Sequence, residues 1–103
     1  MNMSSKPIGI FDSGAGGLSI WKEINALMPY ESTLYISDAK YAPYGSKGAD
    51  VILKRSIVNT ENLLSKGAKI IVVACNTATT NAISYLRNDY KVPFIARLKI
   101  LSD

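Results

Sequence analysis

The sequence predicts an α/β protein in which a parallel β-sheet lies between layers of helices. Short apolar runs alternate along the chain with segments of helical periodicity, and polar turns follow the apolar runs. The clearest run, residues 70–74, is apolar at every position. A strand that is apolar on both faces is typical of a parallel sheet covered on both sides, and alternating strands and helices form such sheets through crossover connections. We therefore expect a three-layer α/β/α architecture.

The first part of the chain predicts a strand, a helix and a second strand. Residues 8–11 form a short apolar run that stops at an aspartate, and the glycines of residues 14–17 then predict a turn. In residues 18–28 the apolar side chains recur at helical spacing, until Pro29 ends the pattern. Residues 34–36 are the second apolar run and predict the second strand.

The second part continues the same alternation after a loop at residues 38–48, which contains a proline and two glycines. A helix is expected from Asp50, and Gly67 closes it in the usual place of a C-terminal glycine. Its expected apolar face carries Leu53, Ile57 and Leu64. The remaining expected segments are a strand at residues 70–74, a polar turn at 75–80, a helix at 82–88 and a strand at 92–95.

The composition excludes several classes of protein. The chain of 103 residues has a net charge of +4, but its basic residues are scattered, so we expect no nucleic-acid partner. No apolar run reaches the ~18–20 residues of a membrane span, and the first seven residues lack the apolar stretch of a signal peptide, so we expect a cytoplasmic protein. With no histidine and one cysteine, Cys75, an internal disulfide and most metal sites are excluded.

Three polar clusters follow the first three predicted strands. Because the carboxyl ends of parallel strands meet at one edge of a sheet, where ligands usually bind, we expect the clusters to surround a shared pocket. The glycines at 14–17 lack the spacing of a dinucleotide-binding loop, so an unrelated nucleotide-binding domain is the weaker alternative. The side chains expected at this edge are Asp12 and Ser13, Asp38 and Tyr44, and Cys75, Asn76 and Thr77.

Each of the main candidates has a functional and a structural interpretation. Cys75 lies between a buried strand and a helix, where the helix N-terminus favours a thiolate, but cysteine is also among the most buried residue types. Asp12 either takes part in the site or organises the glycine turn. Tyr44 either faces a ligand or covers an edge of the core. Trp21, on the first helical stripe, is expected in the core.

The residues that carry this site resemble the amino-terminal part of bacterial glutamate racemases, in the aspartate/glutamate racemase family. The resemblance extends from about Pro7 to Ile95 and implies the truncated first domain of a two-domain racemase. We expect an incomplete racemase-like domain at residues 1–95 and a divergent tail at 96–103. The matching strings are Ile8-Gly-Ile-Phe-Asp-Ser-Gly-Ala-Gly-Gly-Leu-Ser19, Pro43-Tyr44-Gly45 and Val73-Ala-Cys-Asn-Thr-Ala-Thr79.

The resemblance implies an isomerase that interconverts L- and D-glutamate without a cofactor, supplying D-glutamate for peptidoglycan synthesis, cell-wall biogenesis and cell shape. In this family one cysteine thiolate removes the α-proton of glutamate and a second thiol returns a proton to the opposite face. Carried over to this sequence, Cys75 is one of the two thiols. Asp12 and Ser13 would support it and contact the substrate ammonium, while Tyr44, Gly45, Asn76 and Thr77 would hold the carboxylates.

The single cysteine predicts half of such a site, so we expect the chain alone to be inactive. We also expect it to be marginally stable or to self-associate, since an incomplete sheet exposes apolar strand faces and an edge. A non-catalytic remnant, or a small anion-binding α/β module, is the alternative interpretation.

Overall fold

The computed structural model describes residues 5–14 and 16–96, which contain a four-stranded sheet in the order β2-β1-β3-β4. All of its neighbouring strands are parallel. The strands are β1 (Ile8–Asp12), β2 (Thr33–Ser37), β3 (Ile70–Val73) and β4 (Phe94–Ala96). The helices are α1 (Gly17–Leu27), α2 (Ala49–Ser65) and α3 (Asn76–Asp89). The predicted α/β class and parallel sheet are therefore confirmed.

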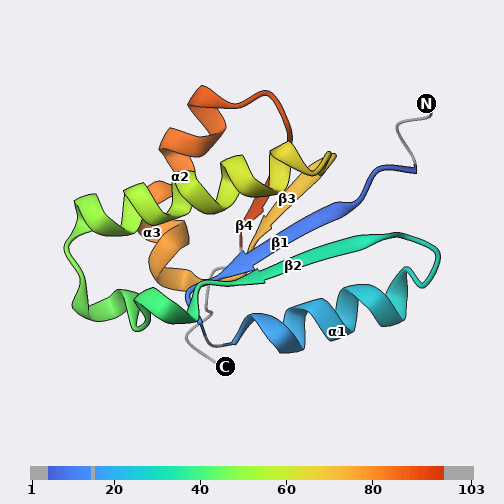
Figure 1. Ribbon diagram of the computed structural model, residues 1–103, viewed down its shortest axis with the longest axis horizontal. Coiled ribbons are helices and arrows are strands. Elements are labelled where there is room, and N and C mark those ends of the chain that lie inside the picture. The colour runs from blue at the N-terminus through green and yellow to red at the C-terminus, as the bar shows by residue number, and fades with distance from the viewer. Residues whose placement is uncertain (1–4, 15, 97–103) are drawn as a thin grey trace.

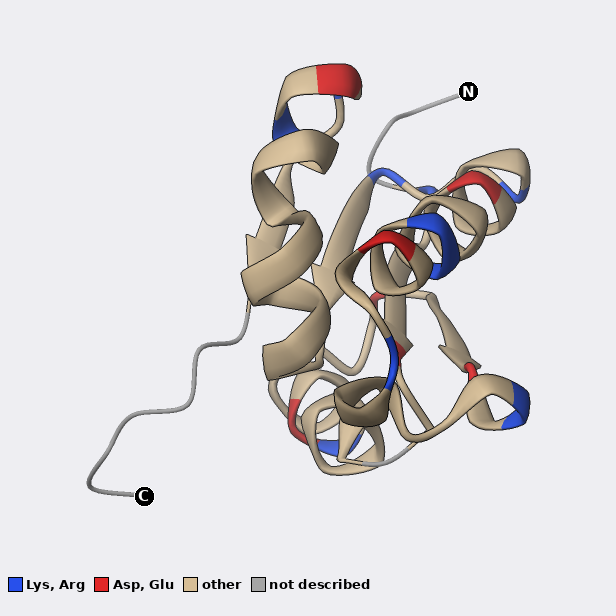
Figure 2. Cartoon of the chain, turned by 90° about the vertical axis from the view of Figure 1, so that its left-hand side faces the viewer, with Lys and Arg blue, Asp and Glu red and all other residues tan. Residues whose placement is uncertain are grey.

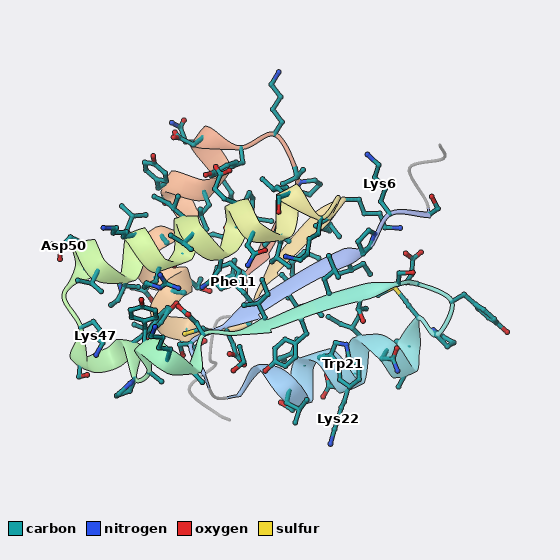
Figure 3. All side chains as sticks on the ribbon, in the orientation of Figure 1. Lys6, Phe11, Trp21, Lys22, Lys47 and Asp50 are labelled. Carbon is teal, nitrogen blue, oxygen red and sulfur yellow. The ribbon has the colours of Figure 1, made fainter. Side chains whose placement is uncertain are left out.

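Helices cover both faces of the sheet, as the three-layer prediction requires. Figure 1 shows α1 on one side of the strands and α2 with α3 on the other. The larger core lies between the sheet and α2 and α3, and Phe11 points into it from β1 (Figure 3). A smaller core lies on the side of α1 and contains Ile8, Ile10, Val72 and Ala74.

Helix α1 covers its side of the sheet only partly. Trp21 packs against the smaller core but is half-buried, and its indole Nε1 donates a hydrogen bond to Thr33 Oγ1 at 2.9 Å. Leu27, near the end of the helix, is 80% exposed. The reason is the position of α1 over β1 and β2, which leaves part of its apolar stripe without a strand beneath it. The expectation that Trp21 lies fully in the core is thus met only in part.

An apolar groove of about 510 Å³ remains between α1 and the β3–β4 half of the sheet. Strand β4, at the edge of the described sheet, forms one side, where Ile95 is 52% exposed. The ion pair between Lys69 and Glu31 lies at the amino ends of the strands and lines the groove as well. The apolar lining consists of Ile8, Ile20, Ile24, Met28, Ile70, Val72, Ile95 and Ala96.

The buried face of α2 differs from the predicted one. Leu53, Ile57 and Leu64 are half-buried and pack at the margin of the core. The face that points inward is rotated by about one residue. On it, Asn59 Nδ2 donates to Asp38 and Tyr44, and Ser56 Oγ donates to the Ile52 carbonyl of the same helix at 2.8 Å. The buried positions of this helix are Ile52, Ser56, Asn59, Thr60 and Leu63.

Two predicted boundaries also change. The segment predicted as a polar turn, residues 75–80, is mostly the first part of α3, which begins at Asn76. The loop at residues 38–48 contains two short 3-10 turns, Ala39–Tyr41 and Tyr44–Ser46, on either side of a cis peptide bond between Ala42 and Pro43. Strand β4 includes Ala96, and residues 97–103 of the predicted tail lie outside the described residues.

Within the described ranges no helix is both long and apolar enough to cross a membrane.

Candidate active site

The order of the strands creates a natural binding position between β1 and β3. The chain runs outward from β1 to β2, then crosses back to β3 on the other side of β1 and continues to β4. In open parallel sheets, ligands bind beyond the carboxyl ends of the strands at the point where the order reverses. Ser13 follows β1 and Cys75 follows β3, so these two residues flank that point.

Cys75 is the N-cap residue of α3, and its side chain contacts Ser13. The thiol Sγ donates a hydrogen bond to Ser13 Oγ at 3.2 Å and accepts one from the backbone N–H of Ala78 at 3.5 Å. The Cys75 carbonyl accepts the first hydrogen bond of the helix, from Thr79 N at 2.9 Å. The sulfur therefore lies at the positive end of the α3 dipole, beside a hydroxyl from another strand.

Asp12 is fully buried and organises the glycine turn. Its Oδ1 accepts from Gly14 N at 2.7 Å, and its Oδ2 accepts from Gly17 N at 2.9 Å and from the Tyr35 hydroxyl at 2.5 Å. Asp12 thereby satisfies the first N–H of α1, which Gly16 cannot cap with a side chain. Burial and the Asp12 carboxylate raise the pKa of Tyr35 to about 12. Asp12 therefore organises the glycine turn, which is one of the two interpretations left open for it.

Two glycines allow this turn to pack closely. A Cβ on Gly17 would lie 2.2 Å from Asp12 Oδ2, so any side chain there would displace the carboxylate. Gly14 has φ +110, and a Cβ on it would lie 2.9 Å from both Ala39 Cα and Ala42 Cβ. The turn after β1 therefore contacts the loop after β2.

Asp38 is the centre of a second polar cluster at this edge. Arg55, from α2, donates to Asp38 through both Nε (2.9 Å) and Nη2 (3.0 Å). The Tyr44 hydroxyl donates to Asp38 Oδ2 at 2.5 Å, and Asn59 Nδ2 donates to the same oxygen at 3.3 Å. The Asp38 N–H donates to the Asp12 carbonyl at 3.1 Å, which links this cluster to the end of β1.

The electrostatics of this cluster favour a charged Asp38. Burial alone would raise the pKa of Asp38, but the hydrogen bonds from Arg55, Tyr44 and Asn59 outweigh it and hold the pKa below its usual value. Burial and the neighbouring Asp38 carboxylate raise the pKa of Tyr44 well above its ordinary value. The hydrogen bond to Asp38 raises the pKa of Arg55. Tyr44 therefore remains a hydrogen-bond donor to a carboxylate at neutral pH.

Tyr44 and Gly45 are at the predicted edge but differ in exposure. The Tyr44 side chain is 1% exposed and belongs to the same core cluster as Cys75, with its hydroxyl directed to Asp38. This matches the interpretation that Tyr44 covers the core. Gly45 is exposed, and nothing lies within 4 Å of the position that its Cβ would occupy. At Gly45 itself the accessible groups are those of the backbone.

Asn76 and Thr77 form the first turn of α3, next to the thiol. Both residues are half-buried. The Asn76 Oδ1 atom is buried, and no hydrogen-bond partner for it lies within the described part of the chain. A buried acceptor usually has a partner, so this oxygen marks a place where a donor would be stabilised.

The structure brings the predicted clusters to one sheet edge but does not place them around the groove. Asp12, Ser13 and Cys75 follow adjacent strands, and hydrogen bonds connect Ser13 to Cys75 and Asp12 to Asp38. The groove of about 510 Å³ is on the α1 side and is lined by none of the predicted site residues. That groove is a separate feature, because apolar strand faces and not the polar strand ends form it. The shared pocket around the strand ends stays a prediction.

Sequence reasoning missed Arg55, Asn59 and Tyr35, which hold the two aspartates. The available signal was on α2, where Arg55 and Asn59 are four residues apart and so share one helix face with buried Ser56 and Thr60 nearby. Polar residues on a face that packs inward indicate partners in the protein. Nothing in the sequence around Tyr35 separates it from an ordinary strand tyrosine.

No group of three or more cysteine, aspartate or glutamate side chains in the described ranges is placed to hold a metal ion. Lys and Arg residues are distributed over several elements and do not gather in one patch in the view of Figure 2.

Comparison with known proteins gives a consistent result for sequence and fold. The chain matches no family model. It is 52% identical over 90 residues to the glutamate racemase of Ectopseudomonas mendocina. It matches the crystal structure of the Thermus thermophilus glutamate racemase in complex with β-chloro-D-alanine with a TM-score of 0.86 and 41% identity. The chain matches part of a glutamate racemase.

The match covers most of this chain and a minority of each glutamate racemase. It includes 87% of this chain and 34% of the E. mendocina protein, and 90% of this chain and 36% of the T. thermophilus chain. The Francisella tularensis glutamate racemase, crystallised with D-glutamate, matches with a TM-score of 0.84 and 34% identity over 90% of this chain and 36% of that one. The chain thus spans about a third of the length of these glutamate racemases.

Proposed function

We propose that this chain carries one half of a glutamate racemase site, in which Cys75 exchanges the α-proton of glutamate without a cofactor. The observation that carries the proposal is the contact between Cys75 and Ser13 across the point where the strand order reverses. It combines a thiol, a hydroxyl and the N-terminus of a 14-residue helix at one place. The similar proteins from T. thermophilus and F. tularensis were crystallised with β-chloro-D-alanine and D-glutamate, which supports the proposal of an amino-acid ligand for this site.

The chemistry requires a base of suitable strength beside groups that stabilise negative charge. In the proposed step the Cys75 thiolate takes the α-proton, the Cα–H bond breaks, and its electron pair passes to Cα and the adjacent carboxylate. The Ala78 N–H, which donates to Sγ, stabilises the thiolate before the transfer. The Ser13 hydroxyl accepts from the thiol and, after a simple rotation of its own proton, donates to the thiolate.

The surrounding groups supply the contacts that the substrate needs. Asn76 Oδ1, a buried acceptor lacking a partner among the described residues, suits an ammonium donor. The backbone of Gly45 and the Thr77 side chain supply donors for carboxylates. Asp12 acts through the turn that it organises, since its oxygens already accept three hydrogen bonds, and that turn carries Ser13. Electrostatic stabilisation of developing charge by fixed donors is usually a large part of such catalysis.

Inversion also needs a second acid on the opposite face of Cα. The 103-residue chain contains one cysteine and no histidine. We therefore place the second thiol on another polypeptide segment, and expect the chain by itself to bind glutamate without inverting it. The D-glutamate formed by the complete site would supply peptidoglycan synthesis in the cytoplasm.

The proposal is tested by titrating the ¹⁵N-labelled chain with L- and D-glutamate and following backbone amide shifts by NMR. We expect saturable shifts at Ser13, Asn76 and Thr77, weaker shifts with glutarate, which lacks the ammonium group, and none with NAD⁺. Asn76→Ala should weaken glutamate binding more than glutarate binding. Thr80→Ala, an exposed position on the same helix, is the matched control and should leave both unchanged. Shifts that are absent with both enantiomers, or stronger with NAD⁺, would overturn the proposal.

A further inference from the structure

We propose that Arg55 is a positioning residue for this site: it holds Asp38, and through Asp38 and Tyr44 it fixes the backbone of Gly45 at the sheet edge. The inference rests on the proposed function, because it assigns a role in binding the substrate carboxylate. The inference adds to the proposed site a residue on α2, outside the three strand-end clusters.

Arg55 is itself held firmly from two directions. Its Nε and Nη2 atoms form a two-pronged contact with the two oxygens of Asp38, at 2.9 and 3.0 Å. Its guanidinium carbon lies 3.8 Å from the centre of the Tyr41 ring, within the loop after β2. A planar guanidinium suits both contacts, and the compact ammonium of lysine suits neither as well. Arg55 thus ties the 38–48 loop to a 17-residue helix at two positions.

Asp38 passes this restraint to Tyr44. The Asp38 carboxylate accepts from the Tyr44 hydroxyl, and Asn59 Nδ2 donates to both Asp38 Oδ2 (3.3 Å) and the Tyr44 hydroxyl oxygen (3.1 Å). These three side chains are buried, at 7%, 1% and 3% exposure. A buried and fully hydrogen-bonded network is rigid, because any displacement leaves a polar group without a partner.

Tyr44 in turn sets the position of Gly45. The turn Tyr44–Ser46 packs against α3, the helix that Cys75 begins, and the Tyr44 carbonyl accepts from Lys47 N at 2.9 Å. Gly45 has no side chain, and open space surrounds its Cβ position, so its own contacts restrain it little. The anchored neighbour Tyr44 therefore determines where the Gly45 backbone lies.

Arg55 also balances charge at an edge proposed to bind an anion. Asp12 and Asp38 both lie there with buried side chains, and a glutamate substrate adds two further carboxylates. The Arg55 cation is paired with Asp38 at 2.9 Å. Without the Arg55 guanidinium, the negative charge of Asp38 would be unpaired and would repel the substrate carboxylates. Salt would screen this repulsion.

The test compares four variants with the wild-type chain: Arg55→Gln, Arg55→Lys, Arg55→Gln combined with Asp38→Asn, and Lys69→Gln. The last is the matched control, since it breaks an ion pair with Glu31 at the opposite end of the strands. Two quantities are measured by NMR: the Kd for D-glutamate at low and high salt, and the hydrogen-exchange rate of the Lys47 amide, which reports the Tyr44 turn.

We expect Arg55→Gln to raise the Kd by about tenfold or more, because small misplacements of groups in a site have large effects, and to speed exchange at Lys47. Exchange at Ala78, beside Cys75, should stay unchanged. Arg55→Lys should give a smaller increase. The double variant, which restores neutrality, should recover affinity relative to Arg55→Gln and lose the extra salt dependence. Lys69→Gln should change neither quantity.

The failures are distinguishable. If the wild-type chain does not bind glutamate, the proposed function fails and this inference fails with it. If the wild type binds and Arg55→Gln or Arg55→Lys binds equally well, the positioning role alone is overturned. Should Arg55→Gln not fold, Arg55→Lys and the double variant decide the question, because the latter keeps hydrogen-bonding groups at both positions without a buried charge.

Discussion

Cys75 Sγ lies 3.2 Å from Ser13 Oγ, although the two residues are 62 positions apart in the chain. The register of the sheet produces this contact. Phe11 is paired with Val73 in the parallel ladder, and the Ala74 N–H continues the ladder by donating to the Phe11 carbonyl at 2.9 Å. A shift of one residue would turn these side chains to opposite faces of the sheet. The apolar core that fixes the register therefore also fixes the candidate site.

Gly17 should be intolerant of any side chain. In Gly17→Ala the added Cβ would meet Asp12 Oδ2 at 2.2 Å and force the carboxylate away from its three donors. We expect a loss of about 2 kcal/mol or more in the free energy of unfolding, measured with urea. Gly45→Ala is the matched control, with open space around its Cβ, and should cost much less. Equal losses in the two variants would contradict the role given to Asp12.

Asp38 should make stability depend on acid pH. Its pKa in the folded chain is lowered below the ordinary value of 3.8, so its contribution to stability is fully present above that ordinary value and is lost as the pH falls through the lower, folded pKa. We expect Asp38→Asn to be less stable than the wild type at pH 6, with the difference shrinking below about pH 4. Urea unfolding between pH 6 and pH 3 measures this. A difference in the free energy of unfolding that stays constant over this pH range would show that the neighbouring donors do not stabilise the charged form of Asp38.

Tyr35 should matter at neutral pH and less in alkali. Tyr35→Phe removes one donor from buried Asp12, for which we expect a loss of about 1 kcal/mol in the free energy of unfolding. The pKa of Tyr35 is raised from 10.0 to about 12, so its contribution is present below pH 10 and is lost as the pH rises towards 12. The difference in the free energy of unfolding between Tyr35→Phe and the wild type, measured with urea, should therefore decrease above pH 10. Tyr30→Phe, at a fully exposed position, is the control and should match the wild type at neutral pH.

The sequence predicted the positions of the strands more reliably than the packing of the helices. The runs at residues 70–74 and 8–11 are apolar on both faces, and short runs of this kind are typical of buried strands in a parallel sheet. The inward face of α2 was predicted from Leu53, Ile57 and Leu64, yet Ser56, Asn59 and Thr60 are buried instead. Periodicity cannot rank a polar residue as buried, because its partners are not visible in the helical pattern: Asn59 bonds Asp38 and Tyr44 from another segment, and Ser56 bonds the Ile52 carbonyl of its own helix.

The candidate site was predictable as a set of strand ends but not as a network. Parallel topology alone places Asp12, Ser13 and Cys75 at one edge. The direction of the Tyr44 side chain was not predictable, since its hydroxyl bonds Asp38 and Asn59, and Asp38 is in turn held by Arg55. The apolar groove beside α1 likewise depends on how far one helix extends across the sheet, a property of three-dimensional packing.

The apolar groove should make the chain self-associate. Ile95 is 52% exposed on β4, an edge strand of the described sheet, and Leu27 on α1 is 80% exposed. Exposed apolar surface next to an open strand edge favours association. We expect sedimentation coefficients that rise with concentration, and a reduced rise for Ile95→Lys. Val58→Lys adds the same charge at an exposed apolar position on α2 and should leave association unchanged. A wild-type chain that stays monomeric at high concentration would contradict this prediction.

The 103-residue chain alone should not racemise glutamate. Inversion requires a proton to leave one face of the α-carbon and another to reach the opposite face, and the sequence offers one thiol and no histidine. A two-fold dimer would not restore the site, because it brings together identical surfaces and not two different halves. Loss of one acid–base partner commonly costs ~10²–10⁴-fold in rate. Incubation of the chain with L-glutamate in deuterated water, with optical rotation and the α-proton signal followed together, measures both events. We expect slow deuterium uptake without inversion, abolished in Cys75→Ala and retained in Thr80→Ala. Formation of D-glutamate that depends on Cys75 would mean that one thiol, or a second copy of the chain, serves both faces.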